Sequence, residues 1–219
     1  MKNIVFIAPP AAGKGTQSDL LKEKYNMVHI STGDLLRHEV ASQSELGIYV
    51  KGLMEQGLLV DDEIIFKLLE ERLSKLDSGS CYILDGFPRD LEQAKVYDEM
   101  SKRLHRSIDY VIFLNISKGE SMKRITGRIS CPSCGAVYNE YFDTFTEKDL
   151  CNKCSTKLEK RSDDNEEIFK HRYDTYIMKT QPVIDYYKEK NILYVVDSGN
   201  SKEYTFSQIE SIIGGEVKW

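Results

Sequence analysis

The stretch APPAAGKGTQ, residues 8–17, constrains the fold of this chain more than any other feature. It follows the apolar run Asn3–Ile7, which is typical of a buried strand, and a helical pattern begins at Thr16. A strand, a loop ending in Gly-Lys and a helix together direct backbone N–H groups and a lysine at phosphate oxygens. The usual loop begins with Gly where this chain has Ala8. We therefore predict a phosphate-binding loop, in which the candidate phosphate-binding residues are Gly13, Lys14, Gly15 and Thr16.

Short apolar runs alternate with helical patterns along the chain. The apolar runs lie at Asn3–Ile7, Cys81–Leu84, Asp109–Ile116 and Ile192–Val196, and His29-Ile30 marks one more short strand. The helical patterns cover Thr16–Lys24, Leu35–Ser42, Asp61–Lys75, Asp90–Arg103, Glu120–Arg128, Asn165–Lys188 and Tyr204–Ile213. Nearly continuous apolar strands are typical of a sheet covered on both faces. The alternation therefore predicts an α/β fold, with a parallel sheet core and helices on both faces.

Two segments break this alternation and are predicted to be inserts in the core. Residues 31–59 hold helical patterns without a strong strand between them. Residues 128–164 are polar and carry two Cys-x-x-Cys pairs. We therefore assign residues 1–30, 60–127 and 165–219 to the core.

Four of the five cysteines form these two pairs, Cys131-x2-Cys134 and Cys151-x2-Cys154. Each pair places two thiols on a tight turn, and two such pairs complete a tetrahedral zinc site. Four thiolates leave no open position for water, so we predict a structural Zn²⁺ that makes a short polar insert rigid. Iron in the same site and two disulfides are the alternatives. Cys81 lies beside an apolar run and is expected to be an inert buried thiol.

The charge balance argues against nucleic acid or membrane as a partner. The chain has a formal net charge of −5, and no apolar run approaches the roughly 20 residues of a membrane span. A zinc module on a phosphate-binding domain is also found in nucleic-acid-binding proteins, but here the residues between the outer cysteines include more acids than bases. The apolar part of the N-terminal MKNIVFIAPP is shorter than the roughly 7–15 residues of a signal peptide, so we expect a cytoplasmic protein.

Several motifs in order make the chain resemble the adenylate kinase family along nearly its whole length. These motifs are APPAAGKGTQ, HISTGDLLR at 29–37, LDGFPR at 84–89 with Gln93, and RSDDNEE at 161–167. The resemblance implies a P-loop nucleoside monophosphate kinase with an AMP-binding insert (31–59) and a zinc-ribbon-like lid (128–164). It implies a monomer that transfers a phosphoryl group from MgATP to AMP, giving two ADP. The family usually has Gly at the positions of Ala8 and Ala11, so the catalytic rate and the ATP affinity are in question.

For the ATP side, the resemblance implies a clamp of basic residues under the lid. Lys14, Arg124, Arg128, Arg161 and Arg172 would hold the phosphates and the charge of the transition state, with Tyr138 also at the ATP site. Arg124 and Arg128 are four residues apart, which predicts one helix face. Asp85 ends an apolar strand, where α/β sheets bind ligands, and resembles the family's acid that holds Mg²⁺. Asp163 and Asp164 would position arginines or cap the following helix.

For the AMP side, the resemblance implies a phosphate subsite and a base pocket. The expected residues are Thr32, Arg37, Gly57, Leu58, Leu59, Val60, Gly86, Arg89, Gln93, Arg161 and Arg172. Arg37 and Arg89 would bind the α-phosphate, and the Gln93 amide is suited to pair with the adenine edge. Thr32 favours AMP, because pyrimidine nucleotide kinases typically have Ala there.

Three alternatives stay open at this point: a UMP/CMP kinase, a catalytically weak nucleotide-binding paralogue, and a zinc-ribbon nucleic-acid-binding protein. Phosphoryl transfer needs fixed positive charges and no strong general base, so the lack of an obvious nucleophile set is no objection. The four histidines receive no role from the sequence.

Overall fold

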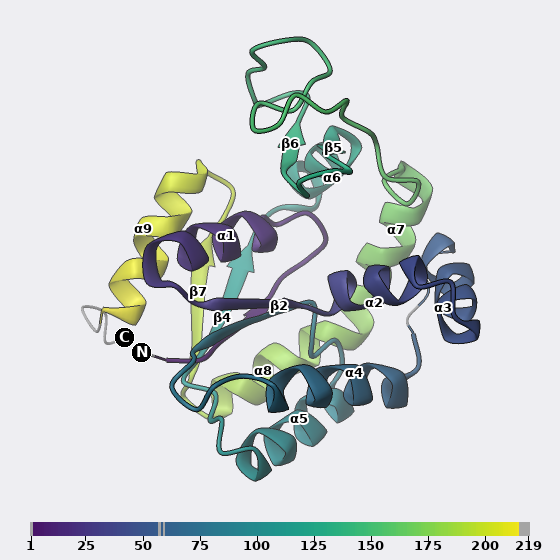
Figure 1. The fold of residues 1–219 in the computed structure, drawn as a ribbon. Helices are drawn as coiled ribbons and strands as arrows, with labels where there is room; N and C mark the ends of the chain where they lie inside the picture. Colours follow the sequence, from purple (N-terminus) through teal and green to yellow (C-terminus); the bar gives the residue numbers. More distant parts are fainter. Residues whose placement is uncertain (1, 57, 59, 215–219) are drawn as a thin grey trace.

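The computed structural model describes residues 2–56, 58 and 60–214 and is built around one parallel sheet (Figure 1). Its five strands are β1 (Ile4–Ile7), β2 (Val28–Ser31), β3 (Tyr82–Asp85), β4 (Tyr110–Asn115) and β7 (Leu193–Asp197). They lie in the order β2-β3-β1-β4-β7, and every pair is parallel. The predicted α/β fold is confirmed, including the short strand at His29-Ile30.

The central strand β1 shows why the sheet carries a core on each face. Ile4 and Phe6 pack in one buried cluster, whereas Val5 and Ile7 pack in another, as the alternation of side chains along a strand requires. The first cluster includes residues of α1 and α9, and the second includes residues of α4, α5 and α8. Because β1 is buried on both faces, its apolar run is continuous.

Nine α-helices are present in the described part of the chain. They are α1 (Lys14–Tyr25), α2 (Thr32–Ala41), α3 (Glu45–Glu55), α4 (Asp62–Ser74), α5 (Leu91–Arg103), α6 (Lys118–Thr126), α7 (Glu166–Thr175), α8 (Gln181–Glu189) and α9 (Lys202–Ile213). None of the helices within these described residues is long and apolar enough to cross a membrane.

Two predicted helices differ from the structure. The run Glu120–Arg128 ends at Thr126, because Gly127 closes α6 and Arg128 begins the strand β5 (Arg128–Ser130). Arg124 and Arg128 therefore do not share a helix face, and that prediction is wrong. The run Asn165–Lys188 contains a π-helical turn, η1 (Tyr176–Thr180), between α7 and α8. Pro182 lacks an N–H at the start of α8, which a widened turn before it accommodates.

The two inserts differ in build. Residues 31–59 contain α2 and α3, which contact each other and continue into the core on the right of Figure 1. Residues 128–164, the lid, contain a short antiparallel hairpin of β5 and β6 (Val137–Asn139) and stand above the sheet in Figure 1. The division of the chain into core, insert and lid stays a prediction.

Candidate active site

The phosphate-binding loop connects β1 to the first turn of α1. Gly13 adopts a left-handed backbone with φ of 92° and caps α1, so Lys14 is the first helical residue. Ala11 has a φ of 55°, which costs an L-residue roughly 1–2 kcal/mol, whereas Ala8 does not have a positive φ. Of the two alanines that replace family glycines, Ala11 alone therefore carries backbone strain. A Cβ added to Gly13 would lie 3.9 Å from Arg124 Nη1, so Arg124 reaches over the loop.

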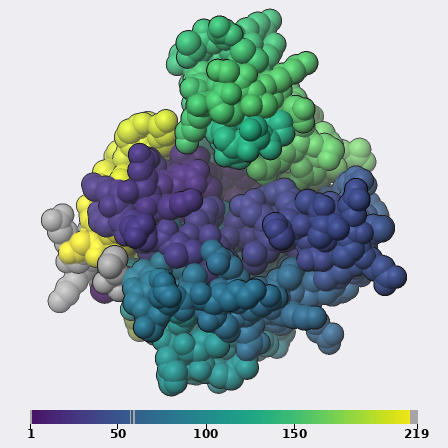
Figure 2. Space-filling view, in the orientation of Figure 1, coloured from purple at the N-terminus to yellow at the C-terminus, as the bar shows by residue number. Residues whose placement is uncertain are grey.

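A single cavity of about 1240 Å³ gathers the predicted site residues. Figure 2 shows it as a hollow between the lid and the purple and blue segments below it. It is lined by Gly13, Lys14, Gly15, Thr16, Thr32, Arg37, Leu58, Val60, Asp85, Gly86, Arg89, Gln93, Arg124, Arg128, Tyr138, Arg161 and Arg172. Gly57 and Leu59 lie outside the described residues. The volume exceeds the roughly 300–1,000 Å³ of a pocket for one small ligand.

The middle of this cavity is crowded with positive charge. Burial lowers the pKa of Lys14, and the nearby Arg89, Arg172 and Arg128 lower it further. Burial and Arg172 also bring the pKa of Arg89 to about 10. Burial and Arg128 do the same for Arg161, again to about 10. Cations that disfavour one another in this way form a site for a polyanion, which relieves their mutual repulsion.

Two acidic residues hold two of the arginines in place. Arg128 Nε donates to Asp164 Oδ2 at 2.6 Å, and Arg172 Nη1 donates to Asp163 Oδ2 at 3.0 Å. The cap of α7 is Asn165, whose side chain accepts from Ile168 N. Asp163 and Asp164 therefore position arginines, whereas the capping role belongs to Asn165.

Several other cationic side chains of the cavity form no ion pair with the described residues and can therefore pair with an anionic ligand. Within the described residues, no carboxylate oxygen lies within 4.0 Å of a side-chain nitrogen of Lys14, Arg89, Arg124 or Arg161. Arg124 does donate to the Asn200 carbonyl at 3.2 Å, which ties α6 to the loop after β7. The cavity thus contains two arginines that are paired with acids, Arg128 and Arg172, and several cations, unpaired in the described part of the chain, whose charge a phosphate chain would neutralise.

Asp85 ends β3 and faces the loop from the neighbouring strand. Burial alone would raise the pKa of Asp85, but His29, Lys14 and Arg89 outweigh it and lower the pKa below its usual value. His29 Nε2 lies 3.7 Å from Asp85 Oδ2, and His29 also lines the cavity. Sequence reasoning gave His29 no role. The signal was its place in the short strand β2, which pairs with β3, the strand that ends at Asp85.

The turn after Asp85 is built around Gly86 and Thr32. Thr32 Oγ1 donates to the Gly86 carbonyl at 2.9 Å, and Arg89 Nε donates to the same carbonyl at 2.8 Å. Gly86 has a φ of 82°, and a Cβ there would lie 2.7 Å from Thr32 Oγ1. Close approach of Thr32 therefore requires a glycine at this position. Arg37 is ion-paired with Asp34.

Gln93 lies in the first turn of α5 and is 2% exposed, yet it lines the cavity. Its Oε1 accepts from Arg89 N at 2.7 Å, and its Nε2 donates to Asp62 Oδ1 at 2.6 Å. Beside it the cavity wall is apolar, formed by Met54, Leu58, Val60, Ile65 and Phe87. This end of the cavity combines a flat apolar wall with one oriented amide, as a base pocket does.

The opposite end of the cavity is also suited to a flat ring. Val137 and Phe142 of the lid line it together with Arg124 and Asn200. Lys123 Nζ lies 5.1 Å from the Phe142 ring centroid, which keeps positive charge at this end too. Sequence reasoning missed Phe142 and Asn200, because neither carries a local motif.

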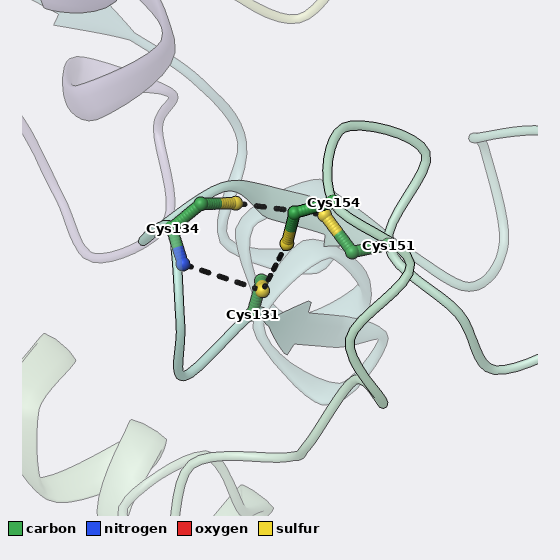
Figure 3. Close-up of side chains that lie close together, drawn as sticks. All are labelled: Cys131, Cys134, Cys151 and Cys154. Atoms are coloured by element: carbon green, nitrogen blue, oxygen red, sulfur yellow. Dashed lines mark hydrogen bonds between the residues drawn. The ribbon is translucent and has the colours of Figure 1, made fainter.

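The four cysteines of the lid form one cluster (Figure 3). Their sulfurs all lie within 4.8 Å of one another, with Cys131–Cys154 at 3.4 Å and Cys134–Cys151 at 3.6 Å. All are free thiols, so the disulfide alternative is wrong. A tetrahedral zinc with bonds of about 2.3 Å would place its sulfurs roughly 3.8 Å apart, so the donor set fits the ion.

Tyr138 contributes to this cluster as well as to the cavity wall. Its hydroxyl lies 3.3 Å from Cys151 Sγ, and its ring packs against Phe145 at a centroid distance of 5.7 Å. The hydrogen bond from Tyr138 lowers the pKa of Cys151, which favours the thiolate that a metal binds. Tyr138 thus joins the four-cysteine cluster to the wall of the cavity.

The layout of the cavity defines the class of protein. Two nucleotides with their phosphates facing each other would fill a space with cations in the middle, an apolar wall at one end and the Phe142 ring beside Lys123 at the other. Transfer between such phosphates needs positioned positive charge and little covalent chemistry. With a phosphate-binding loop on the central strand, the fold and the site are those of a P-loop nucleoside monophosphate kinase.

Comparisons with known proteins narrow this class to one family. The family model for adenylate kinase matches residues 6–192. The adenylate kinase of Archaeoglobus fulgidus is 46% identical over 211 residues, covering 96% of this chain and 97% of the relative. Those of Petrotoga mobilis and Bacillus thuringiensis are 42% and 40% identical, covering 96% and 97% of this chain and 96% and 99% of the relatives.

The chain therefore belongs to the adenylate kinase family, the ATP:AMP phosphotransferases. The four-cysteine cluster is consistent with the long, zinc-binding form of the family. The family model and the relatives together confirm the resemblance that the sequence motifs indicated.

Proposed function

We propose that the protein transfers the terminal phosphoryl group of MgATP in line to AMP, with the cation cluster holding both phosphate chains. An oxygen of the AMP phosphate attacks the γ-phosphorus, and the bridging oxygen leaves with its electron pair as ADP. The attacking oxygen is ionised at neutral pH, so no side chain has to remove a proton. The chain's part is to position charges and to exclude water.

On the ATP side, the loop and Lys14 bind the phosphates, and the arginines balance the charge of the transition state. Gly13, Gly15 and Thr16 offer backbone N–H groups at the start of α1, where the helix dipole favours anions. Arg124 and Phe142 border the base, while Arg128, Arg161 and Arg172 face the transferring group. Asp85, whose pKa is lowered, is the group suited to hold the Mg²⁺ of MgATP, which would neutralise part of the phosphate charge when bound.

On the AMP side, Arg89 and Arg37 bind the phosphate, and the apolar wall with Gln93 binds the base. Arg37 reaches a phosphate only by leaving Asp34, an exposed pair of small cost. Arg161 and Arg172 border both phosphate chains from the lid side. Leu58 and Val60 line this pocket, and the assignment of Gly57 and Leu59 to it rests on the resemblance alone.

The lid is proposed to carry structural zinc rather than a catalytic metal. Four thiolates fill the coordination sphere, so the ion would make residues 128–164 rigid and take no part in the reaction. We further propose that the protein acts as a monomer in the cytoplasm, where its nucleotides are abundant and thiols stay reduced.

One observation carries the proposal: Lys14, Arg89, Arg128, Arg161 and Arg172 line one cavity. Burial and neighbouring cations lower the pKa of Lys14, Arg89, Arg161 and Arg172. The test is ADP formation from MgATP with AMP, CMP, UMP or no acceptor, using protein of known metal content. We expect strong turnover with AMP alone. Preference for CMP or UMP would overturn the acceptor assignment. No turnover with any acceptor would overturn phosphoryl transfer and leave a nucleotide-binding protein.

A further inference from the structure

The amide of Gln93 is held from two sides by groups of opposite kind. Arg89 N donates to its Oε1 at 2.7 Å, and its Nε2 donates to Asp62 Oδ1 at 2.6 Å. A primary amide has two acceptor sites on its oxygen and two hydrogens on its nitrogen. One acceptor site and one hydrogen therefore remain for a ligand in the cavity that Gln93 lines.

The groups that hold this amide are themselves fixed. The Thr180 hydroxyl donates to the Arg89 carbonyl at 2.7 Å, so the Arg89 main chain is anchored to the π-helical turn. The backbone N of Gln93 donates to Asp90, which caps α5. Asp62 lies in the first turn of α4, behind Gln93 as seen from the cavity, whose lining does not include it within the described residues.

These two contacts, with Arg89 N and with Asp62, form a frame that determines the orientation of the Gln93 amide. A reversed Gln93 would point its NH₂ at the Arg89 N–H and its oxygen at the Asp62 carboxylate. Both contacts would be mismatched at a side chain that is 2% exposed, where water cannot repair them. Arg89 N and Asp62 together therefore hold the oxygen and the NH₂ in a single arrangement.

That arrangement matches one purine edge and rejects another. Adenine offers a donor, its 6-amino group, next to an acceptor, N1, which suits an oxygen and an NH₂ in the order that the frame imposes. Hypoxanthine has the reverse order, a 6-oxo acceptor next to an N1–H donor, and would need the reversed amide. A site built to pair with one edge rejects the other because buried polar groups are left unpaired.

We infer that Asp62 is a specificity-determining residue, which makes the acceptor site select 6-aminopurine over 6-oxopurine monophosphates by fixing the orientation of the Gln93 amide. Asp62 acts through Gln93 and touches no substrate. The inference rests on the proposed function, because it takes AMP as the acceptor and Gln93 as the residue that contacts its base.

The test compares the acceptors AMP and IMP, which differ only at this edge of the base, in the wild type and in two variants. Asp62→Asn keeps the size of the side chain but adds a donor, so a reversed Gln93 meets a partner there. Asp61→Asn is the matched control: it removes the same charge one residue away, where the carboxylate accepts from the Tyr49 hydroxyl instead of Gln93. Steady-state kcat/KM for each acceptor at saturating MgATP, the KM for ATP and the melting temperature are measured.

We expect Asp62→Asn to lower the ratio of kcat/KM for AMP to that for IMP at least about tenfold, with the KM for ATP within about twofold of wild type. Asp61→Asn should leave the ratio unchanged. A loss of fold would lower kcat/KM for AMP and for IMP by the same factor. A change in the ratio of the two values therefore reports base selection. An unchanged ratio in Asp62→Asn would overturn the inference while leaving the function intact. A wild type without preference for AMP over IMP would instead overturn the proposed reading of the base by Gln93.

Discussion

The predicted acceptor insert (residues 31–59) and the predicted lid (residues 128–164) border the same cavity but are packed in different ways. Leu36 and Val50 of the acceptor insert belong to the main hydrophobic cluster of the core. The lid has a separate cluster with three buried members, Cys131, Cys151 and Leu158. Two of the three are predicted metal ligands, so the lid has little apolar surface to bury without the metal.

Helix packing completes the contrast. α2 and α3 of the acceptor insert approach so closely that a Cβ on Gly47 would lie 2.3 Å from the Glu39 carbonyl oxygen. The lid hairpin pairs over three residues a strand and adds only isolated bridges, Ser130 with Glu159 and Leu150 with Lys157. The comparison teaches that one insert extends the hydrophobic core, whereas the other has little core of its own and carries a four-cysteine cluster that could bind zinc.

Removing the metal should affect the lid most. We expect Cys151→Ser to lose the ion, to expose residues 128–164 to protease and to lower turnover by at least about 100-fold, since the arginines at both ends of the lid lose their positions. Metal content, limited proteolysis and ADP formation measure this. Cys81→Ser, outside the cluster, is the control and should change none of them. Unchanged proteolysis of Cys151→Ser would show that the lid holds without metal.

Truncating one core side chain in each insert sharpens the comparison. Leu36→Ala should lower the free energy of unfolding of the whole protein by about 2–5 kcal/mol, because Leu36 is buried in the main cluster. Leu158→Ala should loosen the lid in hydrogen exchange while the main melting transition stays nearly unchanged. Denaturant unfolding measures the global stability of both variants, and hydrogen exchange measures the local opening of the lid. Equal losses of global stability would mean that the lid and the core unfold as one unit.

The ion pair at the lid boundary should have a smaller effect. Asp164→Asn removes the charge that holds Arg128 and should lower turnover by about 10-fold or more, since a hydrogen bond to a charged group contributes about 1.5–3 kcal/mol. Glu140→Gln breaks a lid ion pair with Lys160 and is the control. Turnover assays at saturating MgATP and AMP compare them. Equal losses in the two variants would show that Arg128 needs no positioning.

The fold could be predicted from the sequence because each strand and the phosphate-binding loop have a recognisable local pattern. Buried strands such as Asn3–Ile7 are continuous apolar runs, and the loop that follows has its own composition. The failures were also local and had signals. Gly127 and Pro182 mark the end of α6 and the widened turn before α8, and both were visible in the sequence.

The partners of the site residues could not be predicted in this way. His29 approaches Asp85, and Asp62 accepts from Gln93, across 56 and 31 positions of sequence. Strand order and helix packing create these contacts, and neither follows from a motif. The resemblance supplied which residues gather at the cavity, whereas the structure supplies what holds each one.

The most direct test of the account is the turnover of Lys14→Ala, with Lys22→Ala as its control. Lys22 lies on the same helix and is exposed, so its loss changes charge and helix alike without touching the cavity. The account predicts that Lys14→Ala keeps the melting temperature within a few degrees but loses roughly 100- to 1000-fold in turnover of MgATP and AMP. Wild-type turnover by a folded Lys14→Ala protein would contradict the claim that this cation cluster carries the phosphoryl transfer.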